Sequence, residues 1–303
     1  MDAVLVTGGL GFIGARLCGA LLDAGFAVRC VDNLSGSYAP GRGTAAAAAL
    51  RARGAAVAIA DATEAHVRGA DSVIHLAALP GVRTHRPPSE LWAANVELSD
   101  RLARAAAGAG ARFVLASSSS VYGNASRLPT PEHATPAPLN AYAESKVAAE
   151  AAVVARRGDP VIVRPFTVYG PGQRRDMAFA RWTGALASAQ PLPWHAPAGT
   201  ARDFTYVDDV ASGILAALRR GRAGRAYNLS GWKPVPLRDA LHLLAGGDEP
   251  PLNEVASSAA EAHVTHGCGR RAGAELGYAP RVELAEGLRR QVAAAGATGR
   301  LAA

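Results

Sequence analysis

Two residues able to move a proton, Tyr142 and Lys146, stand four positions apart in the segment Asn140-Ala-Tyr-Ala-Glu-Ser-Lys146. On a helix these positions share a face, so the lysine ammonium would lie beside the phenol and favour its ionised form. A phenol with a pKa near 10 is a weak base at neutral pH without such help. The spacing predicts a proton-transfer pair, but chance pairs of this kind are common on solvated helix faces, so the rest of the chain must decide.

A glycine-rich loop opens the chain, between a strand pattern and a helix pattern. The run Val4-Leu-Val-Thr leads into Gly8, Gly11 and Gly14. Glycines allow a tight turn and let backbone N–H groups approach a pyrophosphate at a helix N-terminus. We therefore expect residues 8–14, with Phe12 and Ile13, to bind a dinucleotide. The alternative is a glycine turn that only closes a strand–helix unit.

An acid ends the second strand pattern, where a dinucleotide site needs one. Asp32, followed by Asn33, stands 18 residues after the last glycine of the loop. Such an aspartate accepts hydrogen bonds from both hydroxyls of the adenosine ribose and repels a 2′-phosphate. The sequence therefore predicts NAD rather than NADP, and the combination with Tyr142 and Lys146 indicates hydride chemistry.

Composition excludes several other classes. The 303 residues contain no apolar run of the roughly 18 to 20 residues that a membrane span needs, and Met1-Asp-Ala runs straight into the first strand, so we expect no signal peptide, no membrane partner and a cytoplasmic protein. Cys18, Cys30 and Cys268 form no paired framework, which predicts reduced packing residues.

Charge and metal-ligand patterns exclude two further kinds of partner. The net charge is +7, but the arginines are scattered, so we expect no nucleic-acid partner and some attraction of an anionic substrate. No grouping of His, Cys and Asp has metal-ligand spacing, so no metal is expected, and His75, at the end of a buried strand, is interpreted as structural.

Strand and helix patterns alternate through the first half, which predicts an α/β fold with a Rossmann-type, doubly wound parallel sheet and its ligand at the carboxyl ends of the strands. Strands are expected at residues 57–60, 72–76, 112–116 and 161–164, with residues 202–209 and 226–230 returning to the sheet. We expect an NAD-binding domain of residues 1–166 plus 203–230, and a smaller, interleaved substrate domain of residues 167–202 plus 231–303.

These motifs together resemble the extended short-chain dehydrogenase/reductases that act on nucleotide sugars, from about residue 2 to about residue 290. The matching segments are the glycine loop, Asp32-Asn33, Asp61-Ala62, His75-Leu76-Ala77-Ala78, Ser117 to Gly123, the Tyr142/Lys146 pair, Arg164-Pro-Phe-Thr-Val-Tyr-Gly-Pro171 and Arg202-Asp-Phe-Thr-Tyr-Val-Asp-Asp209. The resemblance implies an enzyme that binds NAD, with contacts also from Asp61, Ala62, Leu76, Ala77 and Ala78. It further implies a UDP- or dTDP-sugar across the cleft and a homodimer formed through two helices of each subunit.

The residues beside the pair narrow the reaction. By resemblance, Ser118 is the third member of a catalytic triad. Relatives that dehydrate dTDP-glucose carry an Asp-Glu pair where this chain has Ser119 and Ser120, and relatives that decarboxylate UDP-glucuronate carry a glutamate in place of Ser120. Without these acids the site can oxidise and reduce but lacks the usual groups for elimination. Reversible oxidation without net redox change is epimerisation.

Two segments resemble UDP-glucuronate 4-epimerases: residues 167–179, with Thr167 and Arg174, and residues 77–83, with Pro80 and Arg83. In those enzymes the counterparts of Thr167 and Arg174 are thought to hold the sugar carboxylate. An arginine fork binds a carboxylate in two places, and hydroxyls of Ser118, Ser119 and Thr167 can complete its hydrogen bonding. The alternatives are an Arg174 that binds loop carbonyls and serines that cap a strand end.

The C-terminal part departs from the family pattern. Its usual arginine, acid and Ala-Asp-like step align with Ser258, Glu261 and Cys268, so either the alignment is shifted here or Arg202 and other groups hold the diphosphate. Trp194 and His195 fall where relatives flank the nucleobase, which predicts stacking on uracil; a plain loop histidine is the alternative for His195.

The sequence thus favours an NAD-dependent 4-epimerase that inverts C4 through a transient 4-keto sugar, most simply UDP-glucuronate to UDP-galacturonate. The alternatives are a UDP-glucose/UDP-galactose-type 4-epimerase, a UDP-glucuronate decarboxylase or another nucleotide-sugar dehydratase or reductase, and a redox-inert NAD-binding regulator.

Overall fold

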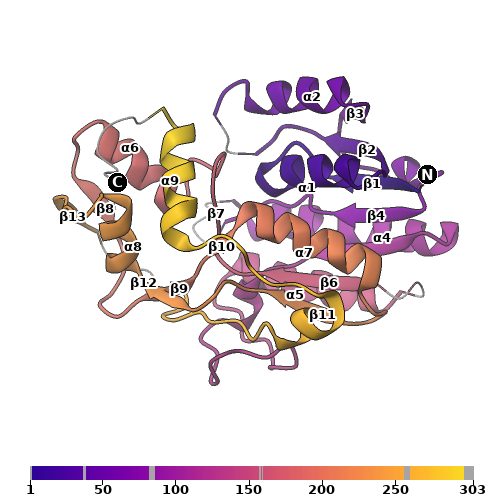
Figure 1. The fold of residues 1–303 in the computed structure, drawn as a ribbon. Helices are drawn as coiled ribbons and strands as arrows, with labels where there is room; N and C mark the ends of the chain where they lie inside the picture. Colours follow the sequence, from indigo (N-terminus) through magenta and orange to yellow (C-terminus); the bar gives the residue numbers. More distant parts are fainter. Residues whose placement is uncertain are drawn as a thin grey trace.

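A seven-stranded parallel sheet forms the centre of the molecule, with strand order β11-β6-β5-β4-β1-β2-β3 (Figure 1). The computed structural model describes residues 2–36, 39–81, 86–156, 158, 160–255 and 260–296. The predicted Rossmann-type, doubly wound α/β class is confirmed. The strands of this sheet are β1 Ala3–Thr7, β2 Ala27–Asp32, β3 Ala56–Ile59, β4 Ser72–His75, β5 Arg112–Ala116, β6 Val161–Pro165 and β11 Ala226–Leu229.

The strand order reverses between β1 and β4. From β1 the chain winds outward through β2 to β3, and from β4 it winds the other way through β5 and β6 to β11. Connections diverge at such a switch point, which leaves a crevice at the carboxyl ends of the strands. In the sheet Thr7 is paired with His75, so the loops that follow β1 and β4 start side by side.

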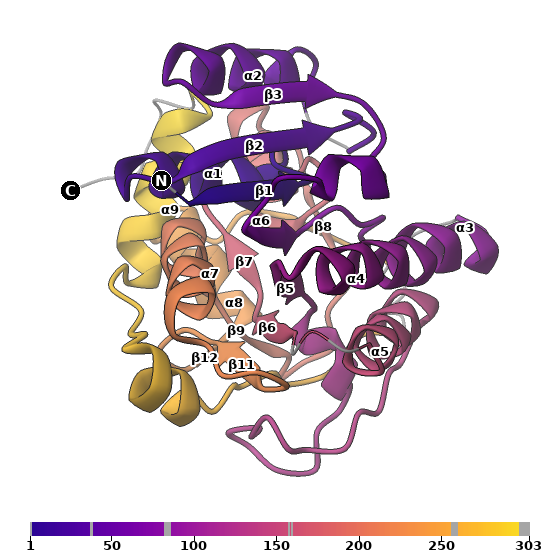
Figure 2. The same ribbon diagram turned by 90° about the vertical axis from the view of Figure 1, so that its right-hand side faces the viewer.

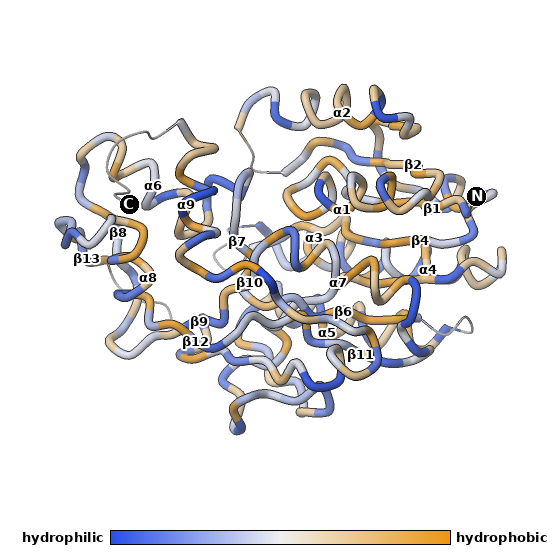
Figure 3. Tube along the Cα trace, viewed as in Figure 1, coloured by the Kyte–Doolittle hydropathy of each residue, from blue (hydrophilic) through white to orange (hydrophobic). Residues whose placement is uncertain are grey.

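Helices cover both faces of the sheet (Figure 2). One face packs against α1 Phe12–Asp23, α2 Arg42–Ala52 and α7 Val207–Arg220, and the other against α4 Leu98–Ala109 and α5 Ala141–Val154. Because side chains alternate along a strand, Val4 and Val6 face α1 and α7 while Leu5 faces α4 and α5. This double burial explains why the strands read as continuous apolar runs (Figure 3).

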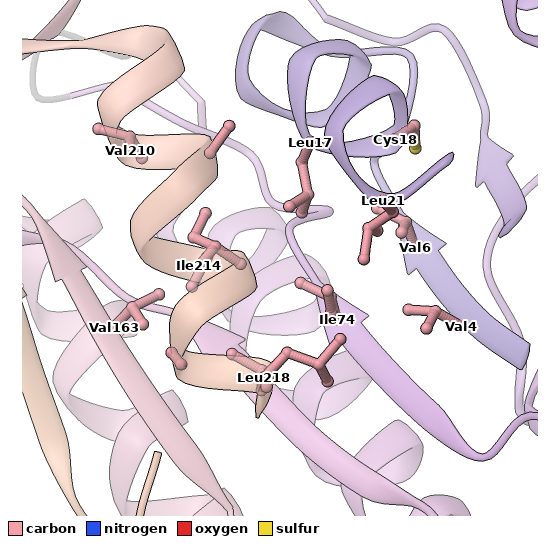
Figure 4. Packing of buried hydrophobic residues seen from close by; sticks show 14 of the residues in the cluster. Val4, Val6, Leu17, Cys18, Leu21, Ile74, Val163, Val210, Ile214 and Leu218 are labelled. Atoms are coloured by element: carbon pink, nitrogen blue, oxygen red, sulfur yellow. The ribbon is translucent and has the colours of Figure 1, made fainter. Parts of the chain in front are cut away.

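Helices α1 and α7 pack against the sheet through buried apolar side chains (Figure 4). Leu17 and Leu21 of α1, together with Ile214 of α7, belong to one buried cluster with Val4, Val6 and Ile74. Their side chains are almost fully inaccessible to water. Burying a side chain of this size contributes about 1.5 to 3 kcal/mol, so the cluster fixes where α1 begins relative to the ends of β1 and β4.

Elements from the second half of the chain lie beyond the carboxyl ends of the strands (Figure 1). An aromatic cluster that includes Tyr169, Phe179, Trp182 and Tyr206 joins several of them. The division of the chain into two domains stays a prediction. The elements from the second half of the chain that lie there are β7 Val168–Tyr169, α6 Ala178–Ala187, β8 Leu192–Trp194, β9 Ala201–Asp203, β10 Thr205–Tyr206, β12 Pro234–Pro236, α8 Leu237–Leu244, β13 Leu252–Glu254 and α9 Leu284–Ala294.

One expected return to the sheet is wrong. Residues 226–230 do return, because β11 pairs with β6. Residues 202–209 do not: β9 pairs with β12, β10 pairs with β7, and α7 begins at Val207. The apolar and aromatic residues of this segment fill the aromatic cluster instead, which periodicity along the chain cannot distinguish from a place in the sheet.

The helix that packs beside α5 is irregular, because α3 and α4 are joined by a π-helical turn. α3 Pro88–Trp92 continues through a π-helical turn, Ala93–Glu97, into α4.

In the part of the chain that the structure describes, no helix is both long enough and apolar enough to cross a membrane.

Candidate active site

The glycine loop closes tightly over the end of the sheet. Gly8 has φ +69°, and a Cβ there would lie 2.7 Å from the backbone nitrogen of Ala77. A Cβ on Gly14 would lie 2.1 Å from the carbonyl oxygen of Gly8. Only glycine therefore lets α1 begin this close to the loop. Gly11 is the N-cap of α1 and offers no side chain to the first-turn N–H groups, including those of Phe12 and Ile13, which suits a phosphate ligand.

Asp32 is held at the end of β2 with both carboxylate oxygens oriented. Its Oδ2 accepts from the Leu10 backbone N–H at 3.0 Å, and its Oδ1 accepts from the Leu34 N–H at 2.8 Å. Each oxygen keeps a further lone pair, so the carboxylate can accept from the two neighbouring hydroxyls of a ribose. Next to it, the Asn33 amide donates to Asp61 Oδ1 at 2.7 Å. This arrangement fits the adenosine half of NAD.

The segment after β4 forms the opposite wall of this site. The backbone N–H of Leu76 donates to the Thr7 carbonyl at 3.1 Å, and that of Ala77 donates to the Thr7 hydroxyl at 3.3 Å. Ala78 and Pro80 come next in the chain and are partly exposed. Ala62, which follows β3, is also partly exposed. Arg83 lies outside the described residues, so its predicted contact with substrate stays a prediction.

The three predicted triad residues come together from two elements. Asn140 caps α5 by accepting from the Ala143 N–H at 2.9 Å, which places Tyr142 and Lys146 on its first two turns. The Tyr142 phenol is hydrogen-bonded to the side chain of Ser118, which follows β5. The Lys146 ammonium is buried and donates to the Ala116 carbonyl at 2.9 Å.

Ser118 is oriented by its neighbour Ser120. The Ser118 hydroxyl oxygen accepts from the Ser120 backbone N–H at 3.1 Å and from the Ser120 hydroxyl at 2.9 Å. With two donors on its oxygen, the hydroxyl has its own proton left to donate to Tyr142. Ser119 begins the 3₁₀ turn that follows, Ser119–Tyr122, and is partly exposed.

Burial changes the pKa values of both Tyr142 and Lys146. Burial raises the pKa of Tyr142 above its ordinary value of 10.0, and the opposing influences are the charge of Arg174 and the hydrogen bond with Ser118. Burial also lowers the pKa of Lys146 to about 8, against the carboxylate of Glu150. Arg174 is therefore a cation from outside this helix that favours the tyrosine anion, while the Lys146 ammonium donates to the Ala116 carbonyl.

Arg174 lies on a loop between β7 and α6, and its charge acts on Tyr142. Its Nε and Nη2 donate to the two carboxylate oxygens of Asp176, each at 2.9 Å. Gln173 braces the loop by donating to the Val168 carbonyl at 3.1 Å, and Gln291 of α9 accepts from the Gly170 N–H at 2.9 Å. The two glutamine side chains are also bonded to each other at 3.0 Å. Thr167 precedes β7 and is partly exposed.

Asn95 is a positioning residue that the sequence did not reveal. Its side chain lies in the π-helical turn and is fully buried. It accepts from the Leu79 N–H at 2.7 Å and donates to the Leu79 carbonyl at 3.0 Å and to the Ser145 hydroxyl at 2.9 Å. Ser145 in turn donates to the Tyr142 carbonyl at 2.7 Å. Asn95 thus ties the loop after β4 to the helix that carries Tyr142.

The two residues expected at the nucleobase lie beside a surface hollow of about 530 Å³, lined by residues 194–200 and by residues of α8 and the segment around β13. The Trp194 ring is only 6% exposed, stacks on Trp182 with 5.7 Å between centroids, and lies 5.2 Å beneath the guanidinium of Arg238. Stacking of a base on Trp194 stays a prediction and would have to displace one of these partners. His195 lies 3.3 Å from a guanidinium nitrogen of Arg181.

Arg202, expected at the diphosphate, is largely buried. Its Nη1 donates to the carbonyls of Ala201 and His263 at 3.0 and 3.1 Å, and its Nη2 lies 3.3 Å from Glu261. Ser258 lies outside the described residues. Cys268 is partly exposed, and its backbone N–H donates to the Thr130 carbonyl at 2.9 Å.

His75 and two of the cysteines are packing residues, as predicted. Cys18 and Cys30 are buried. His75 is bonded to the hydroxyls of Thr7 and Ser99 at 2.6 and 3.0 Å, and burial lowers its pKa to about 3. Among the described residues no group of three or more His, Cys, Asp and Glu side chains could hold a metal ion.

Comparisons with known proteins agree with this geometry. A family model described as "NAD dependent epimerase/dehydratase family" matches residues 4–230. UDP-glucuronate 4-epimerase 3 of Arabidopsis thaliana is 33% identical over 325 residues, covering 95% of this chain and 75% of that protein.

Solved structures resemble the whole fold. UDP-glucuronic acid 4-epimerase from Bacillus cereus, in complex with UDP-glucuronic acid and NAD, superposes with a TM-score of 0.89 at 30% identity, covering 96% of this chain and 98% of that one. A dTDP-glucose 4,6-dehydratase from Streptomyces venezuelae, with NAD bound, has a TM-score of 0.89 at 28% identity, covering 98% and 97% of the two chains. These two proteins carry out different reactions, so the residues of this chain must distinguish between them.

Proposed function

The chain belongs to the NAD-dependent epimerase/dehydratase family, and we propose that it inverts C4 of a UDP-sugar, with UDP-glucuronate as substrate and UDP-galacturonate as product. The protein is an enzyme and its cofactor is NAD. When bound, NAD accepts the hydride of C4 and returns it, and its nicotinamide carries a positive charge during the first half of the reaction.

Tyr142 is the group that moves the proton. As phenolate it takes the proton of the C4 hydroxyl, which leaves a transient 4-keto sugar, and it gives the proton back when the other face of the sugar ring is presented. Ser118 donates a hydrogen bond to the phenol oxygen and so favours the anion. Lys146, fixed by the Ala116 carbonyl, adds a cation on the same helix one turn away.

The serines beside the triad support epimerisation over elimination. An elimination must also move a proton from C5 and protonate the leaving hydroxyl, which needs further acid and base groups near the ring. At the corresponding positions this chain has Ser119 and Ser120, and the Ser120 hydroxyl is engaged with Ser118. A serine has no accessible pKa for such proton transfers.

The choice of substrate is supported by two features of Arg174: its charge favours the anion of Tyr142, and its guanidinium binds a carboxylate, that of Asp176, through two hydrogen bonds. Tyr142 acts at C4, and the carboxylate of a uronic acid is attached to the adjacent carbon C5. A guanidinium whose charge acts on the phenol is therefore suited to bind that carboxylate. Holding it also opposes loss of carbon dioxide from the 4-keto acid, because decarboxylation needs the carboxylate perpendicular to the ketone.

Replacement of Arg174 by alanine tests this proposal, with Arg175→Ala, an exposed neighbour of the same charge, as the matched control. The Arg174 variant should lose about 1.5 to 3 kcal/mol of transition-state stabilisation, roughly 10- to 150-fold in kcat/KM, with UDP-glucuronate and much less with UDP-glucose. A UDP-pentose should appear beside the epimer in NMR spectra, since the freed carboxylate can rotate. The control should lose little with either sugar.

Equal losses on the acidic and neutral sugars would contradict the proposal, as would turnover of UDP-glucose without turnover of UDP-glucuronate. Either result favours a neutral-sugar 4-epimerase. Release of carbon dioxide by the parent enzyme would favour a decarboxylase, and net formation of NADH a dehydrogenase.

We also propose a homodimer built on α3, α4 and α5, which lie side by side on one flank of the molecule (Figure 2). Two large apolar side chains on this flank, Trp92 and Val154, are 48% and 51% exposed. Burying them against a second copy would remove unfavourable apolar surface from water. A monomer mass in light scattering at micromolar concentration would contradict this.

A further inference from the structure

The guanidinium of Arg174 already holds a carboxylate of its own chain. Asp176, two residues further along the loop, accepts from Nε and Nη2 of Arg174 at 2.9 Å each, which is the bidentate geometry that a substrate carboxylate would use. The Arg174 side chain is 16% exposed, whereas that of Asp176 is 50% exposed. The acid is therefore the partner with room to move.

A second guanidinium, that of Arg181, also acts on Asp176. Arg181 is on α6, and its charge, after that of Arg174, also lowers the pKa of Asp176. An Nη atom of Arg181 lies 3.3 Å from Nε2 of His195, next to the hollow beside Trp194. The charges of two arginines, Arg174 and Arg181, thus act on the carboxylate of Asp176.

We propose that Asp176 is a specificity-determining residue, an internal carboxylate that occupies Arg174 until an acidic sugar displaces it toward Arg181. This inference rests on the proposed substrate. One edge of a guanidinium engages one carboxylate at a time, so an acidic sugar and Asp176 compete for the Nε–Nη2 edge of Arg174. A neutral sugar has no anionic group with which to compete, and Asp176 then keeps its place.

Before substrate binds, Asp176 neutralises the charge of Arg174. Arg174 is largely withdrawn from water, and an unpaired guanidinium in such a place is costly. Asp176 compensates that charge when the site holds no acid, and its exposure keeps the pair weak enough to be exchanged. Arg181 then receives the displaced carboxylate, so that Asp176 has an arginine partner in either state.

The test measures binding rather than turnover, in the NAD-loaded Tyr142→Phe protein, by calorimetric titration with UDP-glucuronate and with UDP-glucose. Asp176→Asn removes the competitor and Arg181→Gln removes its second partner. Asp23→Asn is the control for the loss of one negative charge, because Asp23 ends α1 roughly 18 Å from the start of that helix.

The two variants should act in opposite directions on the preference for the acid, defined as the Kd of UDP-glucose divided by that of UDP-glucuronate. Asp176→Asn should raise this ratio about threefold, the size expected for a partly exposed ion pair, and Arg181→Gln should lower it by a similar factor. The control should leave the ratio unchanged. A loss of local structure would instead weaken binding of both sugars in both variants.

Two results overturn the inference. If Asp176→Asn lowers the preference, Asp176 orients Arg174 rather than competing for it, and the proposed substrate still stands. If both variants shift the ratio in the same direction, there is no exchange between the two arginines. Failure of the proposed function is recognised separately, because the Tyr142→Phe protein itself would then show no preference for UDP-glucuronate.

Discussion

Glu150→Gln should destabilise the protein more than any surface charge change, because Glu150 is half of a buried ion pair. Its two oxygens accept from Nε and Nη2 of Arg164 at 2.9 and 2.6 Å, and the two side chains are 9% and 7% exposed. The remaining Nη1 of Arg164 donates to the Tyr122 hydroxyl at 2.7 Å and to the Glu132 carbonyl at 2.9 Å. The pair therefore joins α5, β6 and the turn after Ser118.

The expected loss follows from what the substitution leaves behind. Glutamine keeps the shape and one acceptor but not the charge, so the guanidinium of Arg164 stays buried without a counter-ion. Breaking a buried pair in this way costs about 3 to 5 kcal/mol. A domain is usually stable by only about 5 to 15 kcal/mol, so the urea midpoint should fall markedly. The matched control is Glu90→Gln, in the Arg86–Glu90 pair, whose side chains are 47% and 50% exposed, and it should cost under about 0.5 kcal/mol.

The same variant should move the alkaline limb of the pH profile. Lys146 supports Tyr142 only while protonated, and it loses its proton as pH rises through a pKa of about 8. The negative charge of Glu150 raises that pKa, so its removal lowers it. Activity of Glu150→Gln should therefore begin to fall at a lower pH than that of the parent, measured as kcat/KM against pH. A stability loss below about 1 kcal/mol, or an alkaline limb that stays in place, would refute this view of the pair.

Three further changes probe the cofactor site, the catalytic pair and the buried histidine. Tyr142→Phe should abolish turnover while NAD stays bound, and retention of more than about a tenth of the parent kcat, a loss under 1.4 kcal/mol, would contradict the assignment. Asp32→Ala should weaken the binding of NAD and relax the discrimination against NADP, measured by titration with both cofactors. If the parent protein binds the two equally, the prediction that Asp32 selects NAD is wrong. His75→Gln should flatten the acid dependence of stability. The pKa of His75 is lowered in the folded chain from 6.5 to about 3. Between these pH values the unfolded chain binds a proton at His75 and the folded chain does not. The free energy of unfolding should therefore fall by up to about 1.4 kcal/mol for each pH unit of acidification. Equal slopes of unfolding free energy against pH in the variant and the parent would show that His75 is not the group responsible.

The fold class and the cofactor end of the site could be predicted because their signals are local. Residues 2–36 hold a strand, a glycine loop, a helix and a second strand ending in Asp32, and the chemistry of each step lies within a few residues. Likewise Tyr142 and Lys146 share a helix, so a spacing of four is enough to place them together. The positions of β4, β5 and β6 followed for the same reason, since each contains a short apolar run.

The substrate end could not be predicted in this way because it is assembled from distant segments. Residues 202–209 carry a pattern that suits a strand, yet the aromatic cluster takes them out of the main sheet. Asn95 acts across the chain on Leu79 and Ser145, and it lies in a π-helical turn. No periodicity in the sequence marks such a turn.

The sequence by itself determined the chemistry available to this protein: a dinucleotide loop, an acid for a ribose, and a tyrosine with a lysine and a serine to move one proton. Tertiary structure alone decided which charges meet. It directed Lys146 to the Ala116 carbonyl, brought the charge of Arg174 to act on Tyr142, and bonded Asp176 to Arg174 within the influence of Arg181. Electrostatic energies depend on the distance between charges and on their burial, and neither quantity can be predicted from the order of residues along the chain.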